Sequence, residues 1–114
     1  MVTDKVLIVE GRQDKLRILP VLNEAVEIIC TNGTISEARL EELLAPYEDS
    51  EMYVFFDADH SGEKARKLVQ HYFPHAAHLY TLRMYKQVEH TPRNYLAAVL
   101  ADADFQVNPA YLIR

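Results

Sequence analysis

The stretch YVFFDADHSG, residues 53–62, joins an apolar run directly to two aspartates and a glycine. The same order recurs in KVLIVEG, residues 5–11, which ends on Glu10 and Gly11. Apolar runs without alternation are typical of strands that are buried on both faces, as in parallel sheets. Because open α/β sheets bind ligands beyond the carboxyl ends of their strands, both stretches predict a functional site at that edge.

Strand and helix patterns alternate along the chain and predict an α/β fold. Strands are expected at residues 5–9, 26–30, 52–56 and 78–82. Four helices are expected. The first spans 13–19 and is ended by Pro20, and the second follows a capping-box pattern at 34–37. The third lies around 65–72, and the fourth begins at 91–92. The last three helices carry apolar stripes formed by Leu40, Leu43 and Leu44, by Ala65, Leu68, Val69 and Tyr72, and by Tyr95, Leu96, Val99 and Leu100. Successive β–α units predict a mainly parallel four-stranded sheet with helices on both faces, a three-layer α/β/α arrangement.

Length and composition indicate one compact domain over residues 1–114. The 114 residues, 49% of them hydrophobic, can fill one core. The single cysteine, Cys30, lies in an apolar run and is expected to pack there, so no disulfide framework is possible. Neither a signal-peptide pattern nor an apolar stretch of about 18 residues occurs, and we therefore expect a cytoplasmic protein without membrane attachment.

The formal net charge of −5 disfavours a protein that holds nucleic acid by bulk electrostatics. The positive side chains are nevertheless placed unevenly. They follow the two acidic segments, as Arg12, Lys15 and Arg17 in the first case and Lys64, Arg66 and Lys67 in the second. The acidic balance weakens a nucleic-acid function without excluding it.

The acidic side chains at the sheet edge predict a site for a hard cation. Asp57 and Asp59 are separated by one residue, so in an extended segment their side chains point the same way. Carboxylate oxygens, waters and a substrate phosphate are the usual ligands of Mg²⁺, and Mn²⁺ is an alternative. Glu10 comes from another strand and is expected as a further ligand or as the general acid/base, with Asp14 one helical turn later as another ligand. The simpler alternatives are solvated strand-end carboxylates and, for Asp14, a favourable anion in the first turn of a helix.

Glycines and cations near the same edge predict phosphate contacts. Each of the three glycines follows one of the first three expected strands, where a missing Cβ lets a ligand approach the main chain. Helix N-termini add backbone N–H groups that suit phosphate oxygens. The predicted phosphate or substrate contacts are Gly11, Gly33, Gly62, Lys15, Lys64 and Arg66. Ordinary turn glycines and a solvated helix face are the alternatives.

Two other motif families fail on spacing. Residues 57–62 mimic the start of a calcium-binding EF-hand loop, but Leu68 stands at the twelfth position, where a glutamate is required. An Asp-x-Asp after a strand also resembles haloacid-dehalogenase-type phosphatases, but no later acidic pair follows a convincing strand. The five histidines lack a metal-ligand spacing such as His-Glu-x-x-His, which disfavours a transition-metal site.

The combination of Val-Glu-Gly at 9–11 with Asp-Ala-Asp-x-x-Gly at 57–62 resembles the Toprim domain of topoisomerases, primases and small nucleases. Further similarity at 12–14, 31–34, 63–67 and 88–90 is greatest to the ribonucleases that mature 5S ribosomal RNA, and extends from residue 5 to about residue 100. The resemblance implies a Rossmann-like fold, acid/base or metal-binding work for Glu10, and Mg²⁺ binding by Asp57 and Asp59, with Asp14 contributing as in the nuclease branch. The recognition extension of those ribonucleases is not expected here, because the sequence ends at Arg114.

Two functions therefore remain open at this stage. One is a Mg²⁺-dependent phosphodiester enzyme of the nuclease type, acting on RNA or DNA. The other is a binding or regulatory module that holds nucleic acid or a nucleotide without turnover, together with a partner protein. The carboxylate set favours the first, and the net charge of −5 favours the second.

Overall fold

The computed structural model describes residues 4–33, 36–81 and 85–112. Its centre is a four-stranded sheet in the order β2-β1-β3-β4, with β1 at Lys5–Val9, β2 at Glu27–Cys30, β3 at Glu51–Val54 and β4 at Ala77–His78. All three strand pairs are parallel, as predicted. The chain passes from β1 to β2 on one side and then returns past β1 to β3. The strand order therefore reverses between β1 and β3, which is where sheets of this class bind their ligands.

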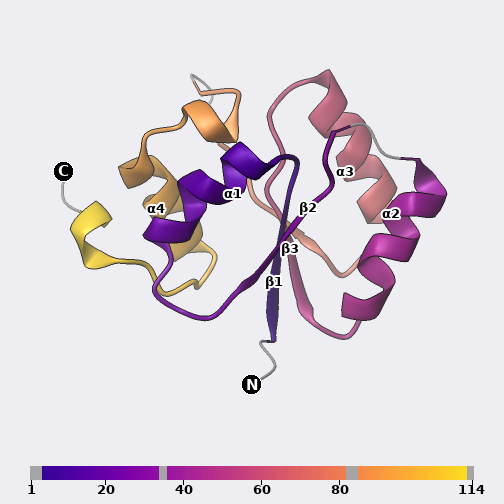
Figure 1. Ribbon diagram of the computed structural model, residues 1–114, viewed down its shortest axis with the longest axis horizontal. Coiled ribbons are helices and arrows are strands. Elements are labelled where there is room, and N and C mark those ends of the chain that lie inside the picture. The colour runs from indigo at the N-terminus through magenta and orange to yellow at the C-terminus, as the bar shows by residue number, and fades with distance from the viewer. Residues whose placement is uncertain (1–3, 34–35, 82–84, 113–114) are drawn as a thin grey trace.

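Helices cover both faces of the sheet (Figure 1), which confirms the three-layer α/β/α arrangement. The helices are α1 at Arg12–Ile18, α2 at Glu37–Leu44, α3 at His60–Tyr72 and α4 at Arg93–Asp102. Figure 1 shows α1 and α4 together on one face and α2 and α3 together on the other. Short 3-10 helices follow or connect them, namely η1 at Leu19–Val21, η2 at Ala45–Tyr47, η3 at Val88–His90 and η4 at Pro109–Leu112.

The apolar run of β1 supplies both cores because successive side chains of a strand point to opposite faces. Leu7 and Val9 pack in the core under α1 and α4, whereas Val6 and Ile8 pack in the core under α2 and α3. All four side chains are buried. The continuous apolar pattern therefore reflects a strand that is covered on both sides, as the sequence indicated.

The structure corrects the predicted start of the second helix. Ser36 is the N-cap, with its Oγ accepting from the backbone N–H of Arg39 at 3.3 Å, and Glu37 is the first helical residue. The capping-box pattern at 34–37 made Glu37 the third residue of the helix, which is wrong because it is the first. Thr34, the N-cap of that pattern, lies outside the described residues. Ser36 satisfies a free N–H of the first turn directly, which starts the helix later than the pattern suggested.

The fourth strand is shorter than the expected 78–82. The ladder continues one bond past β4, from the N–H of Leu79 to the carbonyl of Val54 at 2.7 Å. Beyond this bond the carbonyls of Leu79 and Phe56 accept from a side chain, Nη2 of Arg66, at 2.7 Å and 2.9 Å. A side chain thus occupies the position where another strand–strand bond would form. Leu82 lies outside the described residues.

The last helix packs largely through the face that its periodicity predicted, with Leu96, Val99 and Leu100 in or against the core, and it departs from the prediction at Tyr95. Leu96, Ala97 and Leu100 are buried, but Tyr95 is 37% exposed and its ring lies against Tyr85, with centroids 5.5 Å apart. Beyond α4 the chain packs back on the start of the fold, through an antiparallel bridge between Leu22 and Val107. No helix in the described segments combines the length and apolar character that crossing a membrane requires.

Candidate functional site

Glu10 is held by both neighbours of its strand. Its Oε1 accepts the backbone N–H of Asp57 at 2.7 Å, which links the ends of β1 and β3. Its carbonyl oxygen accepts the N–H groups of Asn32 and Gly33, at 2.7 Å and 3.4 Å, from the turn after β2. The carboxylate therefore lies at the point where the strand order reverses, oriented by two turns that are distant in sequence.

The predicted aspartates are also oriented by backbone N–H groups, each through one oxygen. Asp57 Oδ1 accepts from Val88 at 2.8 Å, and Asp59 Oδ1 accepts from Gly62 at 2.7 Å and caps α3. Asp14 Oδ2 accepts from Gly11 at 2.9 Å at the start of α1. Asp57 and Asp59 are thus fixed by different partners. Their second oxygens, like Oε2 of Glu10, have no hydrogen-bond partner within the described residues.

The cluster is electrostatically strained. Burial raises the pKa of Glu10, and the charges of Asp57, Asp59 and Asp14 raise it further, against the lowering effect of the bond from Asp57. Burial likewise raises the pKa of Asp57, with Asp59 and Glu89 adding to the rise. For Asp14, burial and the charges of Asp57 and Glu89 raise the pKa from 3.8 to about 6. A nearby positive charge would relieve this mutual repulsion.

The donor set fits a hydrated Mg²⁺ better than a closed protein cage. Within residues 4–33, 36–81 and 85–112, no group of three or more His, Cys, Asp or Glu side chains is placed to hold a metal ion together. Mg²⁺ commonly keeps several waters and takes only one or two protein carboxylates. The oxygens of Asp57, Asp59 and Glu10 that accept no hydrogen bond from the described residues are hard ligands of that kind. Three direct carboxylate ligands on one ion stay a prediction.

The three glycines shape the edge but direct their N–H groups inward. Gly11 donates to Asp14, Gly33 to the carbonyl of Glu10, and Gly62 to Asp59. The N–H of Gly62, which the sequence assigned to a phosphate oxygen, is thus used by Asp59 instead, whereas ligand contacts of Gly11 and Gly33 stay predictions. Gly62 has a steric role, since a Cβ there would collide with the carbonyl oxygen of Asp57. Gly33 has φ +90° and open space around the position of a Cβ, as suits a close ligand approach.

Arg66 is structural, which contradicts its predicted phosphate contact. Its side chain is 1% exposed, and besides the carbonyls of Phe56 and Leu79 it bonds Nδ1 of His78 at 3.2 Å. Because a guanidinium only donates, Nδ1 of His78 must accept, which fits the lowering of the pKa of His78 by burial and by Arg66. Lys15 is half-buried and Lys64 exposed, so these two predicted cations remain available to a ligand.

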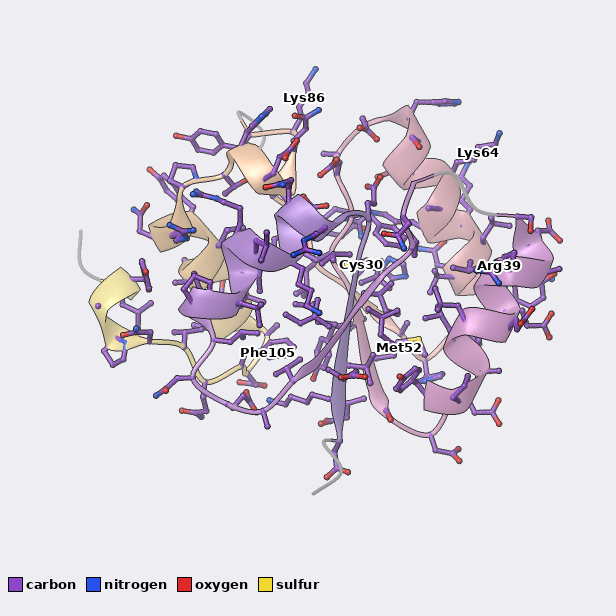
Figure 2. All side chains as sticks on the ribbon, viewed as in Figure 1. Cys30, Arg39, Met52, Lys64, Lys86 and Phe105 are labelled. Carbon is purple, nitrogen blue, oxygen red and sulfur yellow. The ribbon has the colours of Figure 1, made fainter. Side chains whose placement is uncertain are left out.

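A cavity of about 520 Å³ adjoins Glu10 on the side of α2 and α3. Its lining is Glu10, Thr31, Gly33, Ser36, Glu37, His60, Ser61, Lys64, Ala65, Lys67 and Leu68. A second cavity, of about 360 Å³, is lined by Asp59, Tyr85, Lys86, Gln87 and His90. Figure 2 shows Lys64 and Lys86 at this edge of the molecule, one on each side of the strand ends.

The segment around η3 belongs to the site, although the sequence motifs assigned no site residue to it. Its Val88 N–H orients Asp57, and the charge of Glu89 raises the pKa of both Asp57 and Asp14. Its only indication in the sequence was the similarity of Val-Glu-His at 88–90 to the 5S rRNA maturation ribonucleases. Nothing in its local pattern indicated that it returns to the acidic edge.

Comparisons with known proteins agree with this geometry. Residues 5–89 match the family model of the Toprim domain. The chain is 50% identical over 111 residues to the Bacillus subtilis strain 168 protein YusF, covering 97% of this chain and 76% of that protein. It is 34% identical over 77 residues to Ribonuclease M5 1 of Ligilactobacillus salivarius strain UCC118, covering 67% of this chain and 40% of the ribonuclease. A solved structure of a small TOPRIM domain protein from Bacillus stearothermophilus superposes with a TM-score of 0.94 at 49% identity, covering 100% of this chain and 97% of that chain.

Proposed function

Since this chain belongs to the Toprim domain family, we propose that it performs Mg²⁺-dependent phosphodiester chemistry of the nuclease type on RNA or DNA. The observation that carries the proposal is the 2.7 Å bond from the N–H of Asp57 to Glu10 Oε1. It holds a carboxyl group of raised pKa at the reversal point of the sheet, beside two further carboxylates. A carboxyl group whose pKa is shifted toward neutrality is suited to accept and return protons. Similarity to a ribonuclease M5 over part of its length supports RNA as a substrate.

Each residue has a separate role in this chemistry. Glu10 takes or delivers the proton of the attacking or leaving oxygen through Oε2, while Oε1 stays on Asp57. Asp57 and Asp59 hold Mg²⁺ through the oxygens that their backbone partners leave open, and Asp14 adds negative charge to the same edge. Bound Mg²⁺, or Mn²⁺ in its place, neutralises charge that develops on the phosphate oxygens. Lys15 and Lys64 contact substrate phosphates.

A binding or regulatory module without turnover is the second candidate. Two observations favour it: the net charge of −5, and the fact that no three ligand side chains of the described residues are grouped around one point. Such a module would use the same edge to hold nucleic acid or a nucleotide, and a partner protein would supply recognition or chemistry.

Cleavage of a panel of structured RNAs and DNAs in Mg²⁺ or Mn²⁺ tests the proposal. The proteins are wild type, Glu10→Gln, Asp57→Asn and, as a matched control, Asp49→Asn, an exposed aspartate in the turn before β3. Products from wild type and the control, but not from the two site variants, support the enzyme. Calorimetric titration with Mg²⁺ accompanies the assay. Metal-dependent nucleic-acid binding without products supports the second candidate, and absence of both contradicts both functions.

A further inference from the structure

The cavity between α2 and α3 is large enough for a small organic group and opens beside the reacting edge. Its volume of about 520 Å³ lies in the usual range of ligand pockets. Glu10 forms part of its wall, so whatever occupies it is adjacent to the carboxylate that we assign to proton transfer. The roles assigned to Asp57 and Asp59 do not require this space, although its wall contains Lys64, one of the two cations assigned to substrate phosphates.

The lining combines the groups that recognise a nucleotide. Ala65 and Leu68 provide an apolar surface, and Thr31 and Ser61 provide hydroxyl groups that donate and accept hydrogen bonds. A nucleobase offers the matching surfaces, a flat apolar face and a polar edge. The exposed imidazole of His60 can stack on such a face.

Two of the four carboxylate and lysine side chains in the lining are lysines that suit the sugar–phosphate backbone attached to that base, and the other two are Glu10 and Glu37. Lys64 and Lys67, both exposed residues of α3, lie in its wall. On the other side of the strand ends, the second cavity combines Lys86 with the ring of Tyr85 and with Asp59. The carboxylates therefore lie between two cavities that each pair a cation with a ring, an arrangement that suits a single strand crossing the edge.

We propose that the cavity between α2 and α3 takes up one unpaired nucleotide next to the phosphate at Glu10. The inference rests on the proposed function and names its substrate class, a single strand or a duplex with an unpaired nucleotide at the reacting position. A base in a continuous duplex can enter a cavity only after it has left the stack and lost its pairing partner. This step costs less free energy for a base that is already unpaired.

Binding of three fluorescent oligonucleotides of the same sequence tests this, with Ca²⁺ in place of Mg²⁺ to limit turnover. The probes are a single strand, a perfect duplex, and a duplex with one unpaired 2-aminopurine. We expect wild type to bind the two probes with unpaired bases about tenfold more tightly than the perfect duplex, the ratio typical of one accommodated base. The 2-aminopurine fluorescence should change on binding. Ser61→Trp, which fills the cavity, should abolish the preference, whereas Gln70→Trp, exposed on the same helix outside the cavity, should keep it.

The results of these measurements distinguish a failure of the nucleotide pocket from a failure of the proposed function. Equal wild-type affinity for the perfect duplex, with metal-dependent cleavage intact, overturns the nucleotide pocket and leaves the proposed function standing. An unchanged preference in Ser61→Trp, with folding verified by thermal unfolding, overturns the assignment to this cavity. If that variant does not fold, the wild-type affinity ratio and the 2-aminopurine signal still decide. Failure of wild type to bind or cleave any probe contradicts the proposed function itself.

Discussion

Glu10 Oε1 and the backbone nitrogen of Asp57 lie 2.7 Å apart, although 47 residues separate them in the sequence. The bond has two separate consequences for Glu10. It fixes a carboxylate at the reversal point of the sheet, and it uses one oxygen of that carboxylate for structure. Structural and chemical roles of Glu10 can therefore be separated by substitution.

Glu10→Gln should keep the fold and lose the chemistry. The amide retains an oxygen that accepts from Asp57, and it removes a charge that Asp57, Asp59 and Asp14 repel. We expect its free energy of unfolding to equal or exceed that of wild type, while cleavage falls by about 100-fold or more. Glu10→Ala should lose cleavage equally and be less stable than Glu10→Gln by about 1 kcal/mol, since it leaves the N–H of Asp57 without its acceptor. Urea unfolding and cleavage rates measure both. Equal stability of the two variants would count against a structural role of the bond.

The stability of the metal-free protein should depend on Asp14 in a defined pH range. Its pKa is raised from 3.8 to about 6 in the folded state, so the folded protein holds this proton more tightly than the unfolded chain does. The corresponding stabilisation is fully present below pH 3.8 and is lost as the pH rises through about 6. Asp14→Asn stays neutral and can still accept from Gly11. Its stability relative to wild type should therefore increase between about pH 4 and pH 7, by about 1–3 kcal/mol.

Denaturant unfolding in a chelator at several pH values measures this difference. Asp49→Asn is the control and should track wild type throughout, since Asp49 lies in the exposed turn before β3. A constant offset between Asp14→Asn and wild type across the range would contradict the raised pKa.

Removing the guanidinium of Arg66 should destabilise the sheet. Arg66→Met leaves the carbonyls of Phe56 and Leu79 without their donor, at a cost of about 1–3 kcal/mol for each buried group. Arg66→Lys should recover only part of the loss, because an ammonium lacks the second nitrogen through which Arg66 also bonds Nδ1 of His78. Lys67→Met, on the exposed side of the same helix, should be nearly neutral in urea unfolding. A neutral Arg66→Met would refute the bridging role.

Gly62→Ala should reverse the usual effect of alanine in a helix. Alanine normally stabilises a helix interior relative to glycine by about 1 kcal/mol. At Gly62 the added Cβ meets the carbonyl oxygen of Asp57, so we expect a loss of about 1–3 kcal/mol and weaker Mg²⁺ binding, because the two aspartates must shift. Gly11→Ala is the matched control. Its Cβ would lie at an ordinary 3.6 Å from Asp14, in extended backbone that any residue adopts. Thermal unfolding that ranks Gly62→Ala above wild type would contradict the steric argument.

The sheet and its layers could be predicted because they depend on local patterns. The apolar run at residues 5–9 marks a strand that is buried on both faces, the run at 53–56 covers the end of β3 and the two buried residues after it, and the stripe in α3 marks its packed face. The start of α2 depended on which nearby hydroxyl group caps the helix, and the length of β4 depended on a side chain from α3. Ser36 displaced the expected cap of α2, and Arg66 ended the ladder beyond β4. Periodicity contains no information on such contacts.

In the candidate site, too, some features follow from the local sequence and others depend on tertiary contacts. The positions of Glu10, Asp57 and Asp59 follow from their place after strands, whereas the partners that orient them do not. The N–H of Val88 comes from a segment 31 residues beyond Asp57, and the N–H groups of the glycines are directed to carboxylates and a carbonyl rather than outward. Arg66 could not be distinguished from Lys64 by sequence, because burial of a cation is decided by tertiary packing. The sequence thus identifies which groups are acidic, and the fold determines which way they face.

The link between Asp57 and Val88 makes assembly of the acidic edge a late event in the life of the chain. All of β1, β2 and β3 precede η3 in the chain, so during synthesis Asp57 lacks the donor that orients it until η3 has been made. High affinity for metal should therefore arise only once the residues of η3 have docked. Incompletely synthesised chains would therefore expose the edge of the sheet before the carboxylate of Asp57 is oriented.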